Sequence, residues 1–374
     1  MNDASIFQPL ALAQGLRLRN RLVVSPMTTW SANDDGTVSD QEIDYYRARV
    51  KDVGLVITGC THVQPNGAGF TGEFASYDDS FLPSLTKLAV AAKSGGAPAI
   101  LQIFHAGVKT TPDLSDDIVA ASAVPGEAGP FSAAVTPRAL SDAEVMDMVA
   151  AFGEATRRAI EAGFDGVEIH GAHGFIPQNF YSPHSNTRDD RWGGTIEKRL
   201  RFPLALVEDV RSVVAEHATQ PFVIGYRISP DEPNEDGLRI KDTLVLVDRL
   251  IDAGIDYLHV SLPDALHATP VDDPDGTPIV TVMTRHVAGR VPVIAAGQVR
   301  TPAQAKEAIA AGLSLIALGQ ALVINPDWVT KARGGRDNEI RTDIAKSEAR
   351  ALHIPDKLWA IIEMAQGWFK IRPE

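Results

Sequence analysis

The sequence predicts a single (β/α)8 barrel, an α/β fold in which eight parallel strands alternate with helices and close into a ring. Three observations predict it. Short apolar runs of strand length alternate with helical patterns along the chain. Four of these runs follow a Val-Gly or Ala-Gly pair, and the 374 residues leave room for a barrel of about 250 residues with insertions.

The strands are predicted from apolar runs that are too short for helices. Gly54, Gly163, Gly254 and Gly312 stand at the start of four of them, and each is expected to adopt the left-handed conformation that ends the preceding helix. The eight runs are Arg21–Met27, Leu55–Thr58, Ala99–Phe104, Gly163–His170, Phe222–Ile228, Ile255–Ser261, Val291–Ala295 and Leu313–Leu318.

Helical periodicity separates these runs. The last of the helices has Thr301 in the N-cap position and Pro302 in the first turn, so free backbone N–H groups are expected to point out of its start. The helical patterns cover Asp40–Val50, Phe81–Lys93, Asp142–Glu161, Arg199–His217, Ile240–Asp252 and Pro302–Ala310.

One domain, residues 1–374, is expected, with an N-terminal cap, a barrel at about 20–333 and a helical tail at about 334–374. Long loops follow the third, fourth and sixth strands, at Gly107–Leu140, Gly171–Lys198 and Leu262–Met283. Loops after strands are where this fold builds its site. The tail carries apolar residues at helical spacing and two Trp, so it packs on its own barrel or on a neighbour's, and a homo-oligomer through the tail is one hypothesis.

Composition narrows the class of partner. The net charge of −13 disfavours a nucleic acid or an anionic membrane, either of which needs clustered Lys and Arg. The single cysteine, Cys60, excludes an internal disulfide framework. The N-terminus has no apolar signal region, and no apolar run approaches the ~18 residues that span a bilayer. These features predict a cytoplasmic protein.

The strand ends carry neutral hydrogen-bonding groups, one Arg and two Gly-containing turns. They lack the Lys of a Schiff-base enzyme and the acidic cluster that holds Mg²⁺. A planar, amide-rich, phosphorylated ligand fits this set, and flavin mononucleotide (FMN) is such a ligand. The phosphate is expected at the turns of Gly297-Gln298 and Gly319-Gln320, although ordinary strand-to-helix turns would look the same.

Arg227 lies in the middle of a predicted buried strand. An Arg there is too costly unless something anionic or strongly polar meets it. The N1–C2=O edge of a reduced flavin is one such partner. An internal carboxylate such as Glu168, which is predicted to share the inward face, is the other.

His170 and His173 stand at the mouth of the fourth strand, and three interpretations compete for them. A metal site would need a third ligand, which the spacing does not supply. Ordinary polar residues under a loop are the second interpretation. The third, which we favour, is a clamp in which both rings donate hydrogen bonds to a substrate oxygen. No metal is expected.

Three motifs resemble those of the old yellow enzyme family of FMN-dependent NAD(P)H oxidoreductases, which includes ene-reductases. They are Asn20-Arg-Leu-Val-Val-Ser-Pro-Met-Thr28, Gly166-Val-Glu-Ile-His-Gly-Ala-His-Gly174 and the very specific loop Ser182-Pro-His-Ser-Asn-Thr-Arg-Asp-Asp-Arg-Trp-Gly-Gly194. The resemblance runs nearly end to end. It implies that FMN is the cofactor and that NADH or NADPH is the co-substrate, with a small electron acceptor as the partner.

The resemblance also implies roles for individual residues. His170 and His173 would bind the activating group of the substrate, and Trp30, Phe104 and Phe175 would shape the pocket. The Thr28 hydroxyl would contact the flavin O4 edge, with Cys60 nearby. The cofactor-binding set implied is Ser25, Pro26, Met27, Thr28, Cys60, Gln102, Arg227, Gly297, Gln298, Gly319 and Gln320.

Four positions depart from the family pattern. Phe175 stands where the usual proton donor is Tyr, so the proton must come from water or another residue such as Tyr181. Gln320 replaces a phosphate-binding Arg, a loss that Arg300 could offset. Thr28 replaces a frequent flavin-tuning Cys. Val108 replaces a frequent Arg, although Lys109 follows it.

The function predicted from these residues is ping-pong hydride transfer from NAD(P)H through FMN N5 to an enone, quinone or nitro compound. Two alternatives stay open from the sequence. One is a non-redox barrel isomerase that binds phosphorylated ligands, although no general base stands at a strand end. The other is a flavin-binding protein with little catalysis.

Overall fold

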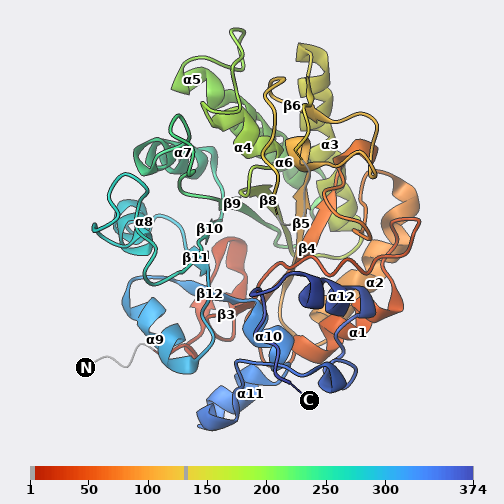
Figure 1. Cartoon of the computed structure of the whole chain (residues 1–374), viewed down its shortest axis with the longest axis vertical. Helices are drawn as coiled ribbons and strands as arrows, with labels where there is room; N and C mark the ends of the chain where they lie inside the picture. The colour runs from red at the N-terminus through yellow and green to blue at the C-terminus, as the bar shows by residue number, and fades with distance from the viewer. Residues whose placement is uncertain (1–4, 130–133, 374) are drawn as a thin grey trace.

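The computed structural model describes residues 5–129 and 134–373, and it confirms the predicted barrel. Eight parallel strands close in the order β10-β11-β12-β3-β4-β5-β8-β9, and Figure 1 shows them at the centre of a ring of helices. Their bounds are β3 Leu22–Val24, β4 Leu55–His62, β5 Ala99–Phe104, β8 Gly166–Gly171, β9 Val223–Ile228, β10 Tyr257–Ser261, β11 Val293–Ala296 and β12 Leu315–Leu318.

The predicted helices all form, within two residues of their expected bounds, and their starts follow from local capping. The side chains of Ser39, Ser141 and Thr301 each accept a hydrogen bond from the backbone N–H three residues further along the chain. The helices are α1 Asp40–Arg49, α2 Leu82–Lys93, α3 Asp142–Glu161, α6 Arg201–His217, α7 Ile240–Ala253 and α9 Pro302–Ala310. Short 3-10 turns are η1 Ala13–Gly15, η2 Pro65–Gly67, η3 Asp79–Phe81, η4 Gly107–Lys109, η5 Asp337–Glu339 and η6 Lys346–Glu348.

Several segments expected to be loops contain helices. The prediction was wrong for α8, Ile279–Val287, which begins inside the expected loop Leu262–Met283. Its β-branched residues have weak helix propensity, so the pattern gave little helical signal. Burial of Ile279, Val280 and Met283 against the core stabilises the helix instead. The fourth-strand loop likewise holds α4 Ile176–Tyr181 and α5 Ile196–Arg199.

Three of the four glycines that begin strands take the predicted left-handed conformation, with φ of 87°, 94° and 104° at Gly163, Gly254 and Gly312. Gly54 does not. There the left-handed residue is Asp52, with φ of 67°. Glycine is needed at position 54 for another reason, because a Cβ would lie 2.2 Å from the backbone oxygen of Asn20.

Additional short segments cover the two ends of the barrel. The N-terminal hairpin, β1 Leu10–Ala11 and β2 Arg17–Leu18, packs Leu12 and Leu18 into a cluster with inward-facing strand residues, and so closes one end. The third-strand loop forms β6 Val119–Ala120 and β7 Arg138–Ala139 on the other side. Residues 130–133 of that loop, together with residues 1–4 and 374 at the ends of the chain, lie outside the described residues.

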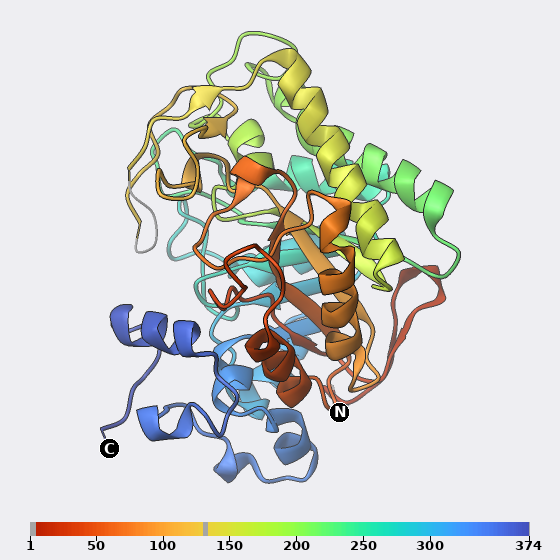
Figure 2. The same cartoon turned by 90° about the vertical axis from the view of Figure 1, so that its right-hand side faces the viewer.

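The tail packs on its own barrel. After α10 Gln320–Ile324 and α11 Trp328–Arg333, the chain returns through α12 Asp356–Met364, drawn in dark blue in Figures 1 and 2. Gln41 of α1 and Asp356 exchange two hydrogen bonds of 2.9 Å each. Within residues 5–129 and 134–373, no helix is long and apolar enough to cross a membrane.

Candidate active site

The carboxyl ends of the strands open into a cavity of about 460 Å³. All the predicted site residues line it except Phe104, so that prediction was wrong. Phe104 is fully buried behind Phe175, whose ring meets it edge to face at 4.9 Å and also meets His170 at 4.7 Å. Lining residues from the prediction are Ser25, Pro26, Met27, Thr28, Trp30, Cys60, Gln102, His170, His173, Phe175, Arg227, Gly297, Gln298, Gly319 and Gln320.

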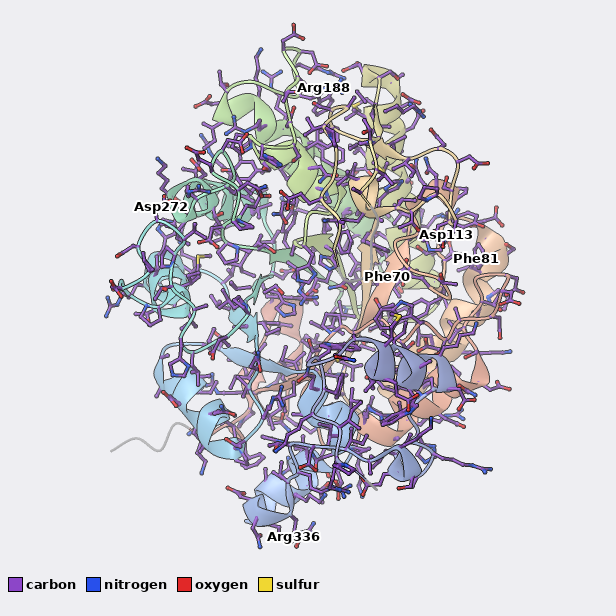
Figure 3. The ribbon with its side chains drawn as sticks, viewed as in Figure 1. Phe70, Phe81, Asp113, Arg188, Asp272 and Arg336 are labelled. Atoms are coloured by element: carbon purple, nitrogen blue, oxygen red, sulfur yellow. The ribbon has the colours of Figure 1, made fainter. Side chains whose placement is uncertain are left out.

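Sequence reasoning missed two aromatic walls of the cavity. The rings of Phe70 and Trp368 lie at 5.4 Å and 5.9 Å from that of Trp30, both edge to face. Phe70 comes from the loop after β4 and lies near the centre of the view in Figure 3, and Trp368 comes from the tail. Neither belongs to a strand-end motif, and the only signal was an excess of Trp in the tail. The other lining residues outside the prediction are Leu262, Pro263, Ala296, Val299, Arg300 and Ala317.

His170 presents a neutral ring to the cavity. It is the second-last residue of β8, and its side chain is buried. Burial, reinforced by the charge of Arg227, lowers the pKa of His170 well below its ordinary value. Its Nδ1 accepts a hydrogen bond from the backbone N–H of Ala172, at 3.4 Å. The ring proton is therefore on Nε2, which makes this atom a hydrogen-bond donor.

His173 faces the same space from the turn after β8. Its backbone has φ of 60°, and its N–H donates to Ser229 Oγ at 3.0 Å. The two imidazoles lie 5.0 Å apart between centroids, and His173 Nε2 lies 2.7 Å from Ser261 Oγ. Desolvation by the surrounding protein, followed by the charge of Arg227, lowers the pKa of His173, although its side chain reaches solvent through the cavity.

Arg227 is buried without an ion pair to a carboxylate in the described part of the chain. Its Nη2 donates to Ser261 Oγ at 3.0 Å, and its Nε has no hydrogen-bond partner. Glu168, the alternative partner, is engaged elsewhere. It accepts from Gln102 Nε2 at 2.6 Å and lies 2.9 Å from His259 Nδ1. Burial would raise the pKa of Glu168, but His259 and Arg227 hold it low. A guanidinium in this state fits an anionic or strongly polar ligand.

The two glycine turns meet around Arg300. Its Nη2 lies 3.2 Å from Gln298 Oε1 and 2.5 Å from Gln320 Oε1, so it stands where the expected family Arg is missing. A Cβ on Gly319 would lie 3.0 Å from Met27 Sδ, which keeps this turn close to the first strand. The Gln320 amide also donates to the backbone oxygen of Trp368, at 2.5 Å.

Several amides at the start of α9 have local partners. The N–H groups of Arg300 and Thr301 both donate to Gln304 Oε1, at 2.9 Å and 3.1 Å, and the Gln304 N–H donates to Thr301 Oγ1 at 3.3 Å. These bonds form a capping box, a local pairing that competes with any ligand. The expected contribution of this helix start to the anion site stays a prediction, beside the glycine turns and Arg300.

Three side chains of the cavity come from backbone in the left-handed region, with φ between 54° and 60°. They are Trp30, His173 and Gln298, none of them glycine. Such conformations cost of order 1–3 kcal/mol each and persist only where the surroundings fix them. Their gathering at one cavity marks it as a functional site.

The cavity offers no phenol for acid catalysis in the described part of the chain. Tyr181 was a predicted proton source, but its hydroxyl donates to the backbone oxygen of Asp242, at 2.5 Å, and it does not line the cavity. Helix α4 turns it toward α7. Val108 and Lys109 line a separate cavity of about 270 Å³ beside His173. No group of three or more His, Cys, Asp or Glu in the described ranges could hold a metal ion.

Comparison with known sequences places the chain among flavin-dependent oxidoreductases. The model of the NADH:flavin oxidoreductase / NADH oxidase family matches residues 5–339. A probable NADH-dependent flavin oxidoreductase of Bacillus subtilis is 44% identical over 97% of this chain and 97% of its own length. The NADH:fumarate oxidoreductase of Klebsiella pneumoniae is 41% identical over 100% of this chain, which spans only 41% of that protein.

Solved structures share the barrel. Morphinone reductase superposes with a TM-score of 0.75 at 26% identity, over 89% of this chain and 90% of its own. The old yellow enzyme of Trypanosoma cruzi also gives a TM-score of 0.75, at 27% identity, over 90% of this chain and 93% of its own.

Proposed function

The chain belongs to the NADH:flavin oxidoreductase / NADH oxidase family and is an FMN-dependent NAD(P)H oxidoreductase, and on this premise we propose that it delivers hydride to an electron-poor acceptor whose oxygen His170 and His173 hold. The acceptor would be an enone, a quinone or a nitro compound. The observation that carries the proposal is the pair of neutral imidazoles, a buried His170 and a His173 open to the cavity, beside the buried Arg227.

The residues of the cavity fit FMN. Bound FMN supplies a two-electron carrier that accepts and releases hydride at N5. Arg227 would hold the N1 and O2 edge, because its Nε is buried without a partner and a negatively charged ring would satisfy it. Gln102 would bond the pyrimidine ring, and the Ser25–Thr28 segment would line the cofactor with backbone groups. The turns of Gly297 and Gly319, with Arg300, would hold the phosphate.

The histidines would hold and polarise the acceptor. A neutral imidazole N–H stabilises negative charge as it develops on a carbonyl or nitro oxygen. His170 would donate from Nε2, and His173, whose Nε2 contacts Ser261 Oγ, would donate from Nδ1. Since the pKa of both rings is lowered, neither is charged at neutral pH before the acceptor binds. Trp30, Phe70 and Phe175 would exclude water and place the acceptor over the reacting face.

The alternatives that the sequence left open lose their support. A non-redox isomerase and a flavin-binding protein with little catalysis both disagree with relatives named NADH oxidase and NADPH dehydrogenase. The cytoplasmic location and a homo-oligomer through the tail remain predictions. The tail already has partners on its own barrel through Gln41 and Gln320.

Anaerobic absorbance spectroscopy of the FMN-loaded protein tests the proposal. NADH or NADPH should bleach the flavin band, and a cyclic enone, a quinone or a nitroarene should restore it. His170→Ala should lower kcat/KM for the acceptor about 10-fold or more, because a hydrogen bond to an oxygen that becomes charged contributes about 1.5–3 kcal/mol. A kcat/KM that stays unchanged in both His170→Ala and His173→Ala would refute the clamp. Failure of both nucleotides to bleach the band would refute the redox cycle.

A further inference from the structure

A buried carboxyl group lies directly behind the cavity. Glu73 belongs to the loop after β4, and its side chain is 1% exposed. Its Oε1 accepts a hydrogen bond from Cys60 Sγ at 2.9 Å, and its Oε2 accepts from the backbone N–H of Gly69 at 3.0 Å. Cys60 itself lines the cavity, and its Sγ is 3.4 Å from Thr28 Oγ1. The carboxyl group therefore reaches the cavity through a single sulfur atom.

This pair occupies the wall where a proton donor is missing. Cys60 and Phe175 pack in one small cluster with Phe104 and Ala106, and Phe70 covers it. Phe175 is the residue that stands in place of the tyrosine expected from the family resemblance. The only thiol of the chain thus lies beside the position that should have carried an acidic O–H group.

From this arrangement, and resting on the proposed function, we propose that Cys60 gives the proton that an enone acceptor needs and that Glu73 restores it to the sulfur. An enone takes hydride, with its two electrons, at the β-carbon and a proton at the α-carbon. The S–H bond of Cys60 breaks as the new C–H bond forms. The O–H bond of Glu73 then breaks to reprotonate the thiolate, and the Glu73 carboxylate recovers a proton from water.

The pKa values of Glu73 and Cys60 favour each proton transfer in the proposed order, from Glu73 to the sulfur and from the sulfur to the substrate carbon. Burial raises the pKa of Glu73 to about 8, so its carboxyl carries a proton at neutral pH. Burial raises the pKa of Cys60 well above its ordinary value. Transfer from Glu73 to a Cys60 thiolate is therefore downhill, and so is transfer from the thiol to an enolate carbon, which is much more basic.

No neighbouring charged or titratable group in the described part of the chain supplies a positive charge that would keep Glu73 ionised. His62 Nδ1 lies 4.0 Å from Glu73 Oε2, but burial lowers the pKa of His62 to about 4, so the ring is neutral. Arg227 of β9 acts electrostatically on the sulfur, where it lowers the pKa of Cys60, rather than on the carboxyl. The proton on Glu73 is therefore held by burial, and it is lost as the pH rises through about 8.

Separate half-reactions of the FMN-loaded protein test the relay. Glu73→Gln and Cys60→Ala should slow reoxidation by 2-cyclohexenone at least about 10-fold, since a positioned acid typically contributes 10²–10⁴-fold. In Glu73→Gln, whose side chain does not line the cavity, reduction by NADH or NADPH should not change, nor should reoxidation by ferricyanide, which takes electrons alone. In Cys60→Ala the enone rate should fall relative to the ferricyanide rate of the same variant. Cys60→Ser, which keeps a donor, should recover part of the enone rate. In the wild type that rate should fall as the pH rises through about 8, and Glu73→Gln should abolish this fall.

Glu42→Gln is the matched control, because Glu42 is a second buried carboxyl group whose pKa burial raises, and it does not line the cavity. Infrared difference spectra between wild type and Glu73→Gln give a readout that needs no turnover. At pH 6 they should contain a protonated-carboxyl band that a carboxylate band replaces at pH 10. An enone rate within twofold of wild type in Glu73→Gln, or a carboxylate band already at pH 6, would overturn the proposal. If neither nucleotide bleaches the wild-type flavin, the proposed function fails, while the infrared bands still decide the state of Glu73.

Discussion

The ring of His173 and the hydroxyl of Ser261 lie 2.7 Å apart, across the ends of β8 and β10. The same hydroxyl oxygen accepts from Arg227 Nη2 at 3.0 Å. Ser261 therefore connects the imidazole proposed to hold the acceptor with the guanidinium proposed to face the cofactor. The connection fixes the ring of His173, whose own backbone is in the left-handed region.

Ser261→Ala is expected to weaken the oxygen clamp without abolishing it. Loss of one hydrogen bond corresponds to about 1 kcal/mol, or about fivefold, in the KM for the acceptor. Steady-state kinetics with an enone or a quinone measures the effect, and Ser229→Ala, which removes only a contact to the His173 backbone, provides the comparison. An acceptor KM equal to that of the wild type would show that Ser261 does not orient the ring.

Most of the site was predictable because it follows strand ends, where parallel strands bring distant motifs together. The exceptions have physical reasons. Phe104 sits at a strand end but packs behind Phe175, and side-chain packing of that kind leaves no period in the sequence. Trp368 and Phe70 enter from the tail and a loop, whose paths no local pattern specifies. The sequence also did not indicate that the N–H groups of Arg300 and Thr301 pair locally, because that pairing depends on the Gln304 side chain folding back over its own helix.

Arg227→Met should lower the reduction potential of the bound flavin and weaken its binding. The methionine removes the positive charge beside the ring edge that becomes anionic on reduction, while it preserves much of the volume. Redox titration against a dye of known potential measures the first effect. Arg227→Lys should give an intermediate potential, because it keeps the charge but loses the planar fork. A potential in Arg227→Met at or above that of the wild type would contradict the proposed position of the guanidinium.

Arg300→Ala should reduce the affinity for FMN about 10-fold or more, since a charge-assisted contact to phosphate is worth about 1.5–3 kcal/mol. Fluorescence titration of the apoprotein with FMN measures the dissociation constant. Riboflavin, which lacks the phosphate, is the control ligand, and its affinity should barely change. Equal losses for the two ligands would mean that Arg300 acts on the fold of the turns rather than on the phosphate.

Truncation after Pro355 should alter catalysis because it removes Trp368 from the cavity wall and the backbone oxygen that Gln320 binds. We expect the truncated, FMN-loaded enzyme to have a higher KM for the acceptor. We also expect O₂ to reoxidise its reduced flavin faster, because the cavity is more open. Light scattering of both proteins tests the homo-oligomer in the same preparation. If the truncation changed neither the kinetics nor the mass in solution, the tail would neither complete the cavity wall nor mediate a homo-oligomer.

Acid should destabilise the fold partly through His105. Its Nδ1 accepts from the Gly107 N–H at 3.0 Å and its Nε2 lies 3.2 Å from Asn66 Oδ1, so the neutral ring is fully used. Burial lowers the pKa of His105 from 6.5 to about 3. Below pH 6.5 the unfolded chain therefore binds a proton at His105 that the folded chain does not bind. The free energy of unfolding keeps its full value above pH 6.5 and decreases as the pH falls toward 3.

Urea unfolding between pH 7 and pH 4 measures this loss, which is at most about 1.4 kcal/mol per pH unit for one group. His105→Gln should be less stable at pH 7 but should show a shallower dependence on pH. His217→Gln, at the exposed end of α6, is the matched control and should keep the wild-type slope. Parallel slopes in all three proteins would show that His105 is not the group responsible.

The aromatic wall of the cavity joins Trp30, near the first strand, to Trp368, in the tail. A chain emerges from the ribosome with its N-terminal part first, and strands can begin to associate before the rest has appeared. The proposed cofactor contacts run from Ser25 to Gln320, so the site is complete only when most of the chain has left the ribosome. Trp368 reaches the wall last, so FMN can be enclosed only at the end of synthesis.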